Sequence, residues 1–77
     1  MLIEVFGPGC AKCQLLEKHT QEAVALSGIA HEVVKINDYA AMTARGVLST
    51  PALAVEGQIK SQGRVLSPQE ILQLLRA

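Results

Sequence analysis

Apolar runs separated by glycine and proline predict a short strand followed by a helix at the start of the chain. Residues 2–6 are apolar at four of five positions, which suits a strand buried on both faces. Gly7-Pro8-Gly9 interrupts this run, and residues 11–27 are good helix formers without glycine or proline that end before Gly28. One face of this helix is expected to pack on the sheet through residues at helical spacing, namely Leu16, Thr20, Ala23 and Ser27, with Leu15, His19 and Leu26 beside them.

The middle of the chain predicts a second strand and a short second helix. Residues 29–36 contain several β-branched side chains and read as a strand. Asn37-Asp38 offers an N-cap for a short helix through Arg45, which Gly46 would end. Tyr39, at the start of this helix, is expected to be a packing or surface residue and not a catalytic one.

The last third of the chain predicts a β-hairpin and a C-terminal helix. Residues 52–55 and 58–61 flank a Glu56-Gly57 turn, which is typical of two antiparallel strands. Residues 67–70 (Ser-Pro-Gln-Glu) form a capping box with proline at the first helical position, followed by the apolar side of a helix.

These elements predict an α/β fold in the order β-α-β-α-β-β-α. A right-handed crossover makes the first two strands parallel, and the hairpin adds antiparallel strands on the other side of the first strand. We therefore expect a mixed four-stranded sheet with helices on both faces. At 77 residues, the chain is expected to form one domain that spans residues 1–77.

Charge and composition exclude several classes of function. Seven basic and seven acidic residues give a net charge of zero, so binding to nucleic acid or to an anionic membrane is not expected. No apolar stretch approaches the ~20 residues of a membrane-spanning helix, and the N-terminus does not have the pattern of a signal peptide. We therefore expect a cytoplasmic protein, in which two cysteines serve metal binding or redox chemistry better than a structural disulfide.

The two cysteines are spaced as Cys10-Ala11-Lys12-Cys13. Cys10 lies where the first strand gives way to the helix, and the unpaired N–H groups and dipole at a helix N-terminus favour the thiolate. Cys10 is therefore the predicted attacking thiol. Cys13 follows one helical turn later and is the predicted resolving thiol. Lys12 either adds electrostatic support to the thiolate or is only a solvated surface lysine.

Metal binding is the alternative use of such a pair. A zinc site needs about four ligands, and the two histidines, His19 and His31, lack zinc-finger spacing, so we expect them to be ordinary helix and strand residues. A soft-metal carrier that uses the two thiolates remains an alternative, because thiolates select such metals. Small copper-binding domains, however, have a β-α-β-β-α-β order and a methionine shortly before the first cysteine.

A wider set of motifs resembles the small thioredoxin-like, redox-active disulfide proteins of bacteria and archaea. The resemblance covers nearly the whole chain and is carried by three segments: residues 9–13 after a strand, Gly46-Val47 followed by residues 50–53 (Thr-Pro-Ala-Leu), and Gly63 before the final capped helix. It implies a thiol-disulfide oxidoreductase with a redox-active Cys10–Cys13 disulfide and no cofactor or metal. It also implies disulfide-containing protein substrates, a reductase such as a thioredoxin reductase, and a monomer. A domain whose disulfide acts only as a regulatory switch is a third possibility.

The same resemblance implies a cis peptide bond before Pro51, beside the cysteine pair, where the backbone of Thr50 pairs with a substrate strand. The implied substrate-binding residues are Thr50, Pro51, Gly9 and Lys12. Thioredoxins carry tryptophan before the first cysteine and Gly-Pro between the pair, which this chain lacks, so their redox potential cannot be transferred to it. The elements that hold glutathione in glutaredoxins are not matched by residues 49–51 and Gly57, so a dedicated glutathione site is not implied.

Overall fold

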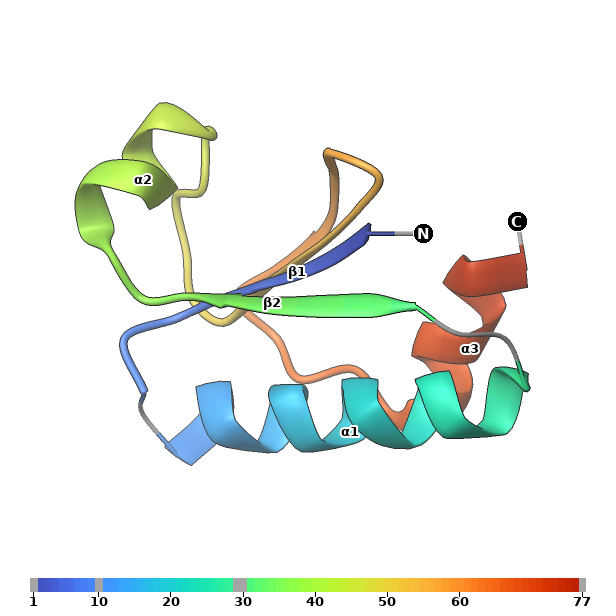
Figure 1. Ribbon diagram of the computed structural model, residues 1–77. Helices are drawn as coiled ribbons and strands as arrows, with labels where there is room; N and C mark the ends of the chain where they lie inside the picture. Colours follow the sequence, from blue (N-terminus) through green and yellow to red (C-terminus); the bar gives the residue numbers. More distant parts are fainter. Residues whose placement is uncertain (1, 10, 29–30, 77) are drawn as a thin grey trace.

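The computed structural model describes residues 2–9, 11–28 and 31–76 (Figure 1). Its helices and strands, in chain order, are β1 (Leu2–Phe6), α1 (Ala11–Ser27), β2 (Glu32–Ile36), α2 (Tyr39–Ala44), β3 (Ala52–Val55), β4 (Gln58–Gln62) and α3 (Pro68–Arg76). This order confirms the predicted succession of elements. The predicted bounds of the second strand are wrong, because β2 begins at Glu32 and His31 precedes it. The remaining residues predicted for that strand, Ile29 and Ala30, lie outside the described residues.

The four strands form one mixed sheet in the order β2-β1-β3-β4. As predicted, β1 is parallel to β2 and antiparallel to β3, and β3 and β4 form the hairpin. Phe6 pairs with Ile36 on one side and with Ala52 on the other, and the N–H of Gly7 extends the ladder by donating to the Ile36 carbonyl at 2.9 Å. The end of β1, the end of β2 and the start of β3 therefore lie together at one end of the sheet.

Helices cover both faces of the sheet, as Figure 1 shows. α1 and α3 pack on one face, and α2 lies over the other. The core on the first face is made by apolar side chains of the sheet, of both helices and of the segment before α3: Ile3, Val5, Leu16, Ala23, Leu53, Val55, Leu66, Ile71 and Leu75. A smaller core lies under α2 and contains Phe6, Met42, Val47, Ala52 and Ala54.

Local hydrogen bonds explain where the shorter elements begin. Asp38 caps α2 by accepting a hydrogen bond from the N–H of Ala40 at 3.0 Å. At the start of α3 the N–H of Ser67 donates to the Glu70 carboxylate and the N–H of Glu70 donates to the Ser67 hydroxyl, at 3.1 and 3.2 Å. The hydrogen bond from the Ser67 backbone, with help from Arg64, lowers the pKa of Glu70. Both capping residues predicted from sequence are thereby confirmed.

The buried face of α1 only partly matches the set of residues predicted to pack on the sheet. Leu16, Thr20 and Ala23 are buried, and the Thr20 hydroxyl is satisfied by the Leu16 carbonyl at 2.7 Å. Leu15 and Leu26 are instead 43% and 59% exposed, so the helix buries a narrower face than its apolar residues indicate. His19 has a structural partner, because its Nδ1 donates to the Leu66 carbonyl at 2.8 Å and so joins α1 to the segment before α3.

A buried charged residue lies in β1, one of the two inner strands of the sheet. Glu4 is only 6% exposed, and its two carboxylate oxygens accept hydrogen bonds from the Arg45 guanidinium at 2.6 and 2.7 Å. The guanidinium also lies 5.6 Å from the centre of the Phe6 ring. The hydrogen bonds and the negative charge of Glu4 raise the pKa of Arg45. Because Arg45 caps the C-terminus of α2, this ion pair fastens α2 to β1.

Arg45→Met is expected to lower the midpoint of thermal unfolding by about 5–10 °C, because it leaves the buried Glu4 carboxylate without a counter-charge. Lys35→Met is the matched control, since it removes the cation of the more exposed Lys35–Glu17 pair at 3.3 Å and should shift the midpoint by no more than about 3 °C. Differential scanning calorimetry at neutral pH measures both. Equal shifts in the two variants would contradict a special role for the Glu4–Arg45 pair.

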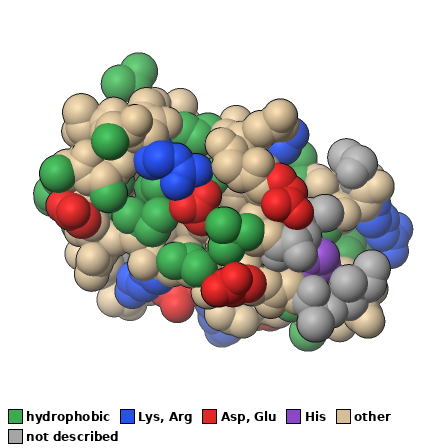
Figure 2. All heavy atoms as spheres, turned by 45° about the horizontal axis from the view of Figure 1, so that its top comes forward, with side chains coloured by type: hydrophobic (Ala, Val, Ile, Leu, Met, Phe, Trp, Pro, Cys, Tyr) green, Lys and Arg blue, Asp and Glu red, His purple; other side chains and the backbone are tan. Residues whose placement is uncertain are grey.

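The surface on the α2 side carries charges of both signs, and the start of β1 and the end of α3 lie at one end of the sheet. On the α2 side of the molecule, Figure 2 shows basic and acidic side chains interspersed with hydrophobic ones. β1 begins and α3 ends at the opposite end of the sheet from the β1–α1 connection (Figure 1). In the described parts of the chain, no helix has both the length and the apolar character needed to span a bilayer.

Candidate active site

The second cysteine of the pair lies in the first turn of α1, at the end of the sheet where β1 and β2 finish. Cys13 is 1% exposed and is among the buried residues of the helix. Cys10, the predicted attacking thiol, lies outside the described residues. The buried position of Cys13 fits the resolving role predicted for it, because an external disulfide has no direct access to its sulfur.

Gly7 lies against the side chain of Cys13. A Cβ added to Gly7 would overlap the Cys13 Sγ and would lie 2.7 Å from the Cys13 Cβ. The hydrogen bond from the Gly7 N–H to Ile36 holds this backbone at the end of the β1–β2 ladder. Glycine is therefore required at position 7 because the backbone there lies close to the Cys13 thiol, and not because its φ is unusual. From the sequence alone, Gly7 was interpreted only as the residue that ends a strand. The signal for its contact with the cysteine pair is its position three residues before Cys10.

Gly9 and Lys12 were predicted to line the substrate-binding surface. Gly9 has a φ of 94°, a conformation that favours glycine, and its carbonyl accepts a hydrogen bond from the Gln14 side chain at 3.0 Å. This bond ties the loop before α1 to the second turn of the helix. Lys12 is exposed on the first turn of α1. Gly9 therefore lies just before α1 and Lys12 in its first turn, both within four residues of Cys13 in the chain.

The Thr50–Pro51 peptide bond is cis, as the sequence resemblance implies. Pro51 is buried and Thr50 is partly exposed. The Pro51 carbonyl accepts a hydrogen bond from the N–H of Gly63 at 2.9 Å, whereas the backbone of Thr50 has no hydrogen-bond partner within the described part of the chain. Because Phe6 pairs with Ala52, the antiparallel register brings Pro51 beside Gly7. The residue against Cys13 and the cis proline therefore meet at the same end of the sheet.

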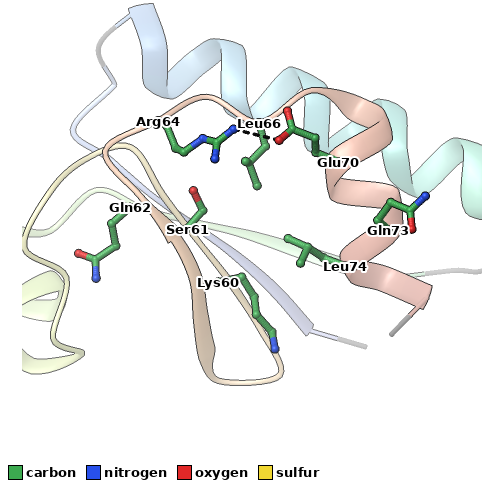
Figure 3. A pocket seen from close by; sticks show the side chains of 8 residues that line it. All are labelled: Lys60, Ser61, Gln62, Arg64, Leu66, Glu70, Gln73 and Leu74. Atoms are coloured by element: carbon green, nitrogen blue, oxygen red, sulfur yellow. Dashed lines mark hydrogen bonds and ion pairs between the residues drawn. The ribbon is translucent and has the colours of Figure 1, made fainter.

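A separate groove of about 450 Å³ lies between β4 and α3 (Figure 3). It is lined by Lys60, Ser61, Gln62, Arg64, Leu66, Glu70, Gln73 and Leu74. Arg64 and Glu70 form an ion pair at 2.9 Å across its rim. Neither Cys13 nor Pro51 contributes to this groove. Among the described residues, no group of three or more histidine, cysteine or acidic side chains is arranged to hold a metal ion.

Comparison with known proteins agrees with this geometry. The sequence profile of the thioredoxin domain matches residues 1–76. The chain belongs to the thioredoxin family. It is 44% identical over 75 residues to a thioredoxin of Methanothermobacter thermautotrophicus, with 97% of each chain covered. It is 34% identical over 77 residues to a thioredoxin of Methanocaldococcus jannaschii, covering 100% of this chain and 88% of that one.

Membership of the thioredoxin family defines the class of reaction. The protein is a thiol-disulfide oxidoreductase, and the mixed four-stranded sheet with three helices is the thioredoxin-like fold predicted from the sequence. Thioredoxins perform this chemistry without a bound cofactor, since the electrons reside on their own sulfur atoms.

Proposed function

We propose that the protein exchanges disulfides with protein substrates through Cys10 and Cys13. The observation that carries this proposal is the burial of Cys13 in the first turn of α1, with Pro51 at the same end of the sheet. A buried second thiol suits an internal step that follows attack by the first thiol. The position of Cys10 in the sequence, three residues before Cys13, makes it that first thiol.

The proposed reaction moves two electrons from the protein to its substrate. The Cys10 thiolate attacks one sulfur of the substrate disulfide and forms a mixed disulfide, and the other substrate sulfur leaves as a thiolate that takes up a proton. The Cys13 thiolate then attacks the Cys10 sulfur, forms the Cys10–Cys13 disulfide and releases the second substrate thiol. A reductase, such as a thioredoxin reductase, returns two electrons and restores both thiols.

The proposed docking edge consists of Thr50 and Pro51, with Gly9 and Lys12 beside the cysteine pair. Support comes from the Thr50 backbone, whose N–H and carbonyl are not used by the described residues and remain available to an extended substrate segment. Substrates are disulfide-containing proteins, and the protein acts as a monomer in the cytoplasm. A soft-metal carrier would use the same two thiolates, and it makes a different prediction for the purified protein.

Mild oxidation is expected to yield a Cys10–Cys13 disulfide within one chain, because residues one helical turn apart bring their sulfurs within bonding reach. Intact-mass measurement should show the loss of two hydrogen atoms per chain, and peptide mapping should place the disulfide between these cysteines. Bound metal is assayed in the aerobically purified protein before the oxidation step, while both thiols are still able to bind it. Predominant disulfide-linked dimers, or one tightly retained metal ion per chain, would contradict the proposal.

A further inference from the structure

The segment Leu48–Pro51, here called the docking segment, is held by the end of strand β4. The Oε1 atom of Gln62 accepts hydrogen bonds from the N–H groups of Leu48 and Ser49, at 2.7 and 3.3 Å. Figure 3 shows the Gln62 side chain directed away from Leu66 and Leu74 and toward the loop that leads into β3. Although Gln62 lines the groove beside α3, its amide therefore serves the docking segment.

The next residue of the chain fixes the other end of the same segment. The N–H of Gly63 donates to the Pro51 carbonyl at 2.9 Å. Gly63 has a φ of 74°, and a Cβ added to it would lie 3.2 Å from the Ser49 Cβ, so this backbone packs closely on the docking segment. Two consecutive residues, one through its side chain and one through its backbone, thus hold both ends of the segment and leave Thr50 between them.

We propose that Gln62 is a positioning residue for substrate docking. By holding Leu48 and Ser49, it keeps the docking segment in the shape that pairs with an extended stretch of the substrate next to its disulfide. A segment ordered before binding loses less conformational freedom when the substrate pairs with it. This inference rests on the proposed function, because it assumes that substrates pair with the Thr50 backbone.

The docking segment also indicates what the substrate presents to it. Residues 46–52 contain no charged side chain, and Leu48 is 90% exposed although its backbone is fixed by Gln62. An exposed leucine on an ordered backbone offers apolar contact area at a low cost in ordering. The segment therefore fits an extended, uncharged stretch of a substrate protein with an apolar side chain near its disulfide.

A pair of variants at one position tests the role of Gln62. Gln62→Met keeps the length of the side chain but removes the acceptor, whereas Gln62→Glu keeps a carboxyl oxygen at the same distance along the side chain. Gln58→Met is the matched control, since Gln58 is exposed on the same strand and its amide accepts from the Lys60 ammonium instead. KM and kcat are measured with insulin as the protein disulfide and with hydroxyethyl disulfide as a small one.

Gln62→Met is expected to raise KM for insulin about three- to tenfold, as the loss of a hydrogen-bonding acceptor predicts, and to leave the kinetics with hydroxyethyl disulfide within about twofold of the parent. Gln62→Glu and Gln58→Met should behave as the parent. Amide hydrogen exchange should show faster exchange at Leu48 and Ser49 in Gln62→Met alone.

Three results would overturn the inference. If Gln62→Met has the parental KM for insulin, the docking role of Gln62 is refuted and the proposed function is not affected. If Gln62→Met loses equal activity with insulin and with hydroxyethyl disulfide, the substitution acts on the thiols or on the fold, and the docking role is also refuted. A parent chain that reduces neither disulfide refutes the proposed function itself, and the docking role falls with it.

Discussion

A chain carrying Cys13→Ser is expected to accumulate as a mixed disulfide with its substrates, whereas Cys10→Ser should trap almost nothing. The reason is the burial of the Cys13 sulfur. Cys13 is 1% exposed in the first turn of α1, so we expect an incoming protein disulfide to be attacked by Cys10 and not by Cys13. Without Cys13, nothing within the chain attacks the mixed disulfide, and the substrate stays bound. Turnover should fall by about a hundredfold or more in both variants.

Trapping from a cell lysate under denaturing, non-reducing conditions measures this difference and identifies the substrates. The double variant, with serine at both positions, is the control for non-specific disulfides. Because both single variants retain one thiol, a difference between them reflects position and not the number of cysteines. Equal trapping by the two single variants would contradict the assignment of Cys10 as the attacking thiol and would favour two equivalent metal ligands.

Gly7→Ala is the second change with a large expected effect. The added methyl group would overlap the Cys13 Sγ, so either the thiol rotates away or the end of β1 moves off the β2 ladder. Overpacking of this kind typically costs about 1–3 kcal/mol of unfolding free energy. Displacement of the resolving sulfur should also slow the second exchange step, by about tenfold or more for a misplacement near 1 Å. Single-turnover release of substrate from the mixed disulfide measures this step.

Gly28→Ala is the control for the effect on stability alone. Gly28 has a φ of 71°, and apart from its chain neighbours no described residue comes within 4 Å of an added Cβ, so alanine there strains the backbone without touching Cys13. It should lower stability and leave the release step unchanged at temperatures where the chain is folded. A double-mutant cycle of Gly7→Ala with Cys13→Ala should give a coupling energy of about 0.5 kcal/mol or more. Independent effects, or a normal release step in Gly7→Ala, would refute the steric role of Gly7.

The element order could be predicted from the sequence because its signals are local. The cap at Asp38, the Glu56-Gly57 turn and the Ser67–Glu70 box act over two to four residues, and each forms as expected, with φ values of 53° and 80° in the turn. The cis bond at Pro51 was implied by family resemblance and not by any local signal. An X-Pro bond is cis in only about 5–6% of cases in folded proteins.

The interactions that shape the site could not be predicted, because they join residues far apart in the chain. Glu4 reads as a single polar residue in a buried strand, and its partner Arg45 is 41 residues away. Gln62 lies one residue beyond the strand predicted at residues 58–61, yet its amide holds Leu48 and Ser49 across 14 and 13 residues. Leu15 and Leu26 were expected beside the packed face of the helix and are exposed instead, because apolar character alone does not show whether another element covers a side chain.

The arrangement of the chain ends has a practical consequence for immobilisation. β1 starts and α3 finishes at the end of the sheet that is farthest from the β1–α1 connection, as Figure 1 shows. A tag or a tether joined at either end of the chain therefore extends away from Cys13 and the docking segment. The Cys13→Ser variant can be coupled to a resin through either terminus with its reactive end facing the mobile phase, and bound substrates can be eluted with a reductant.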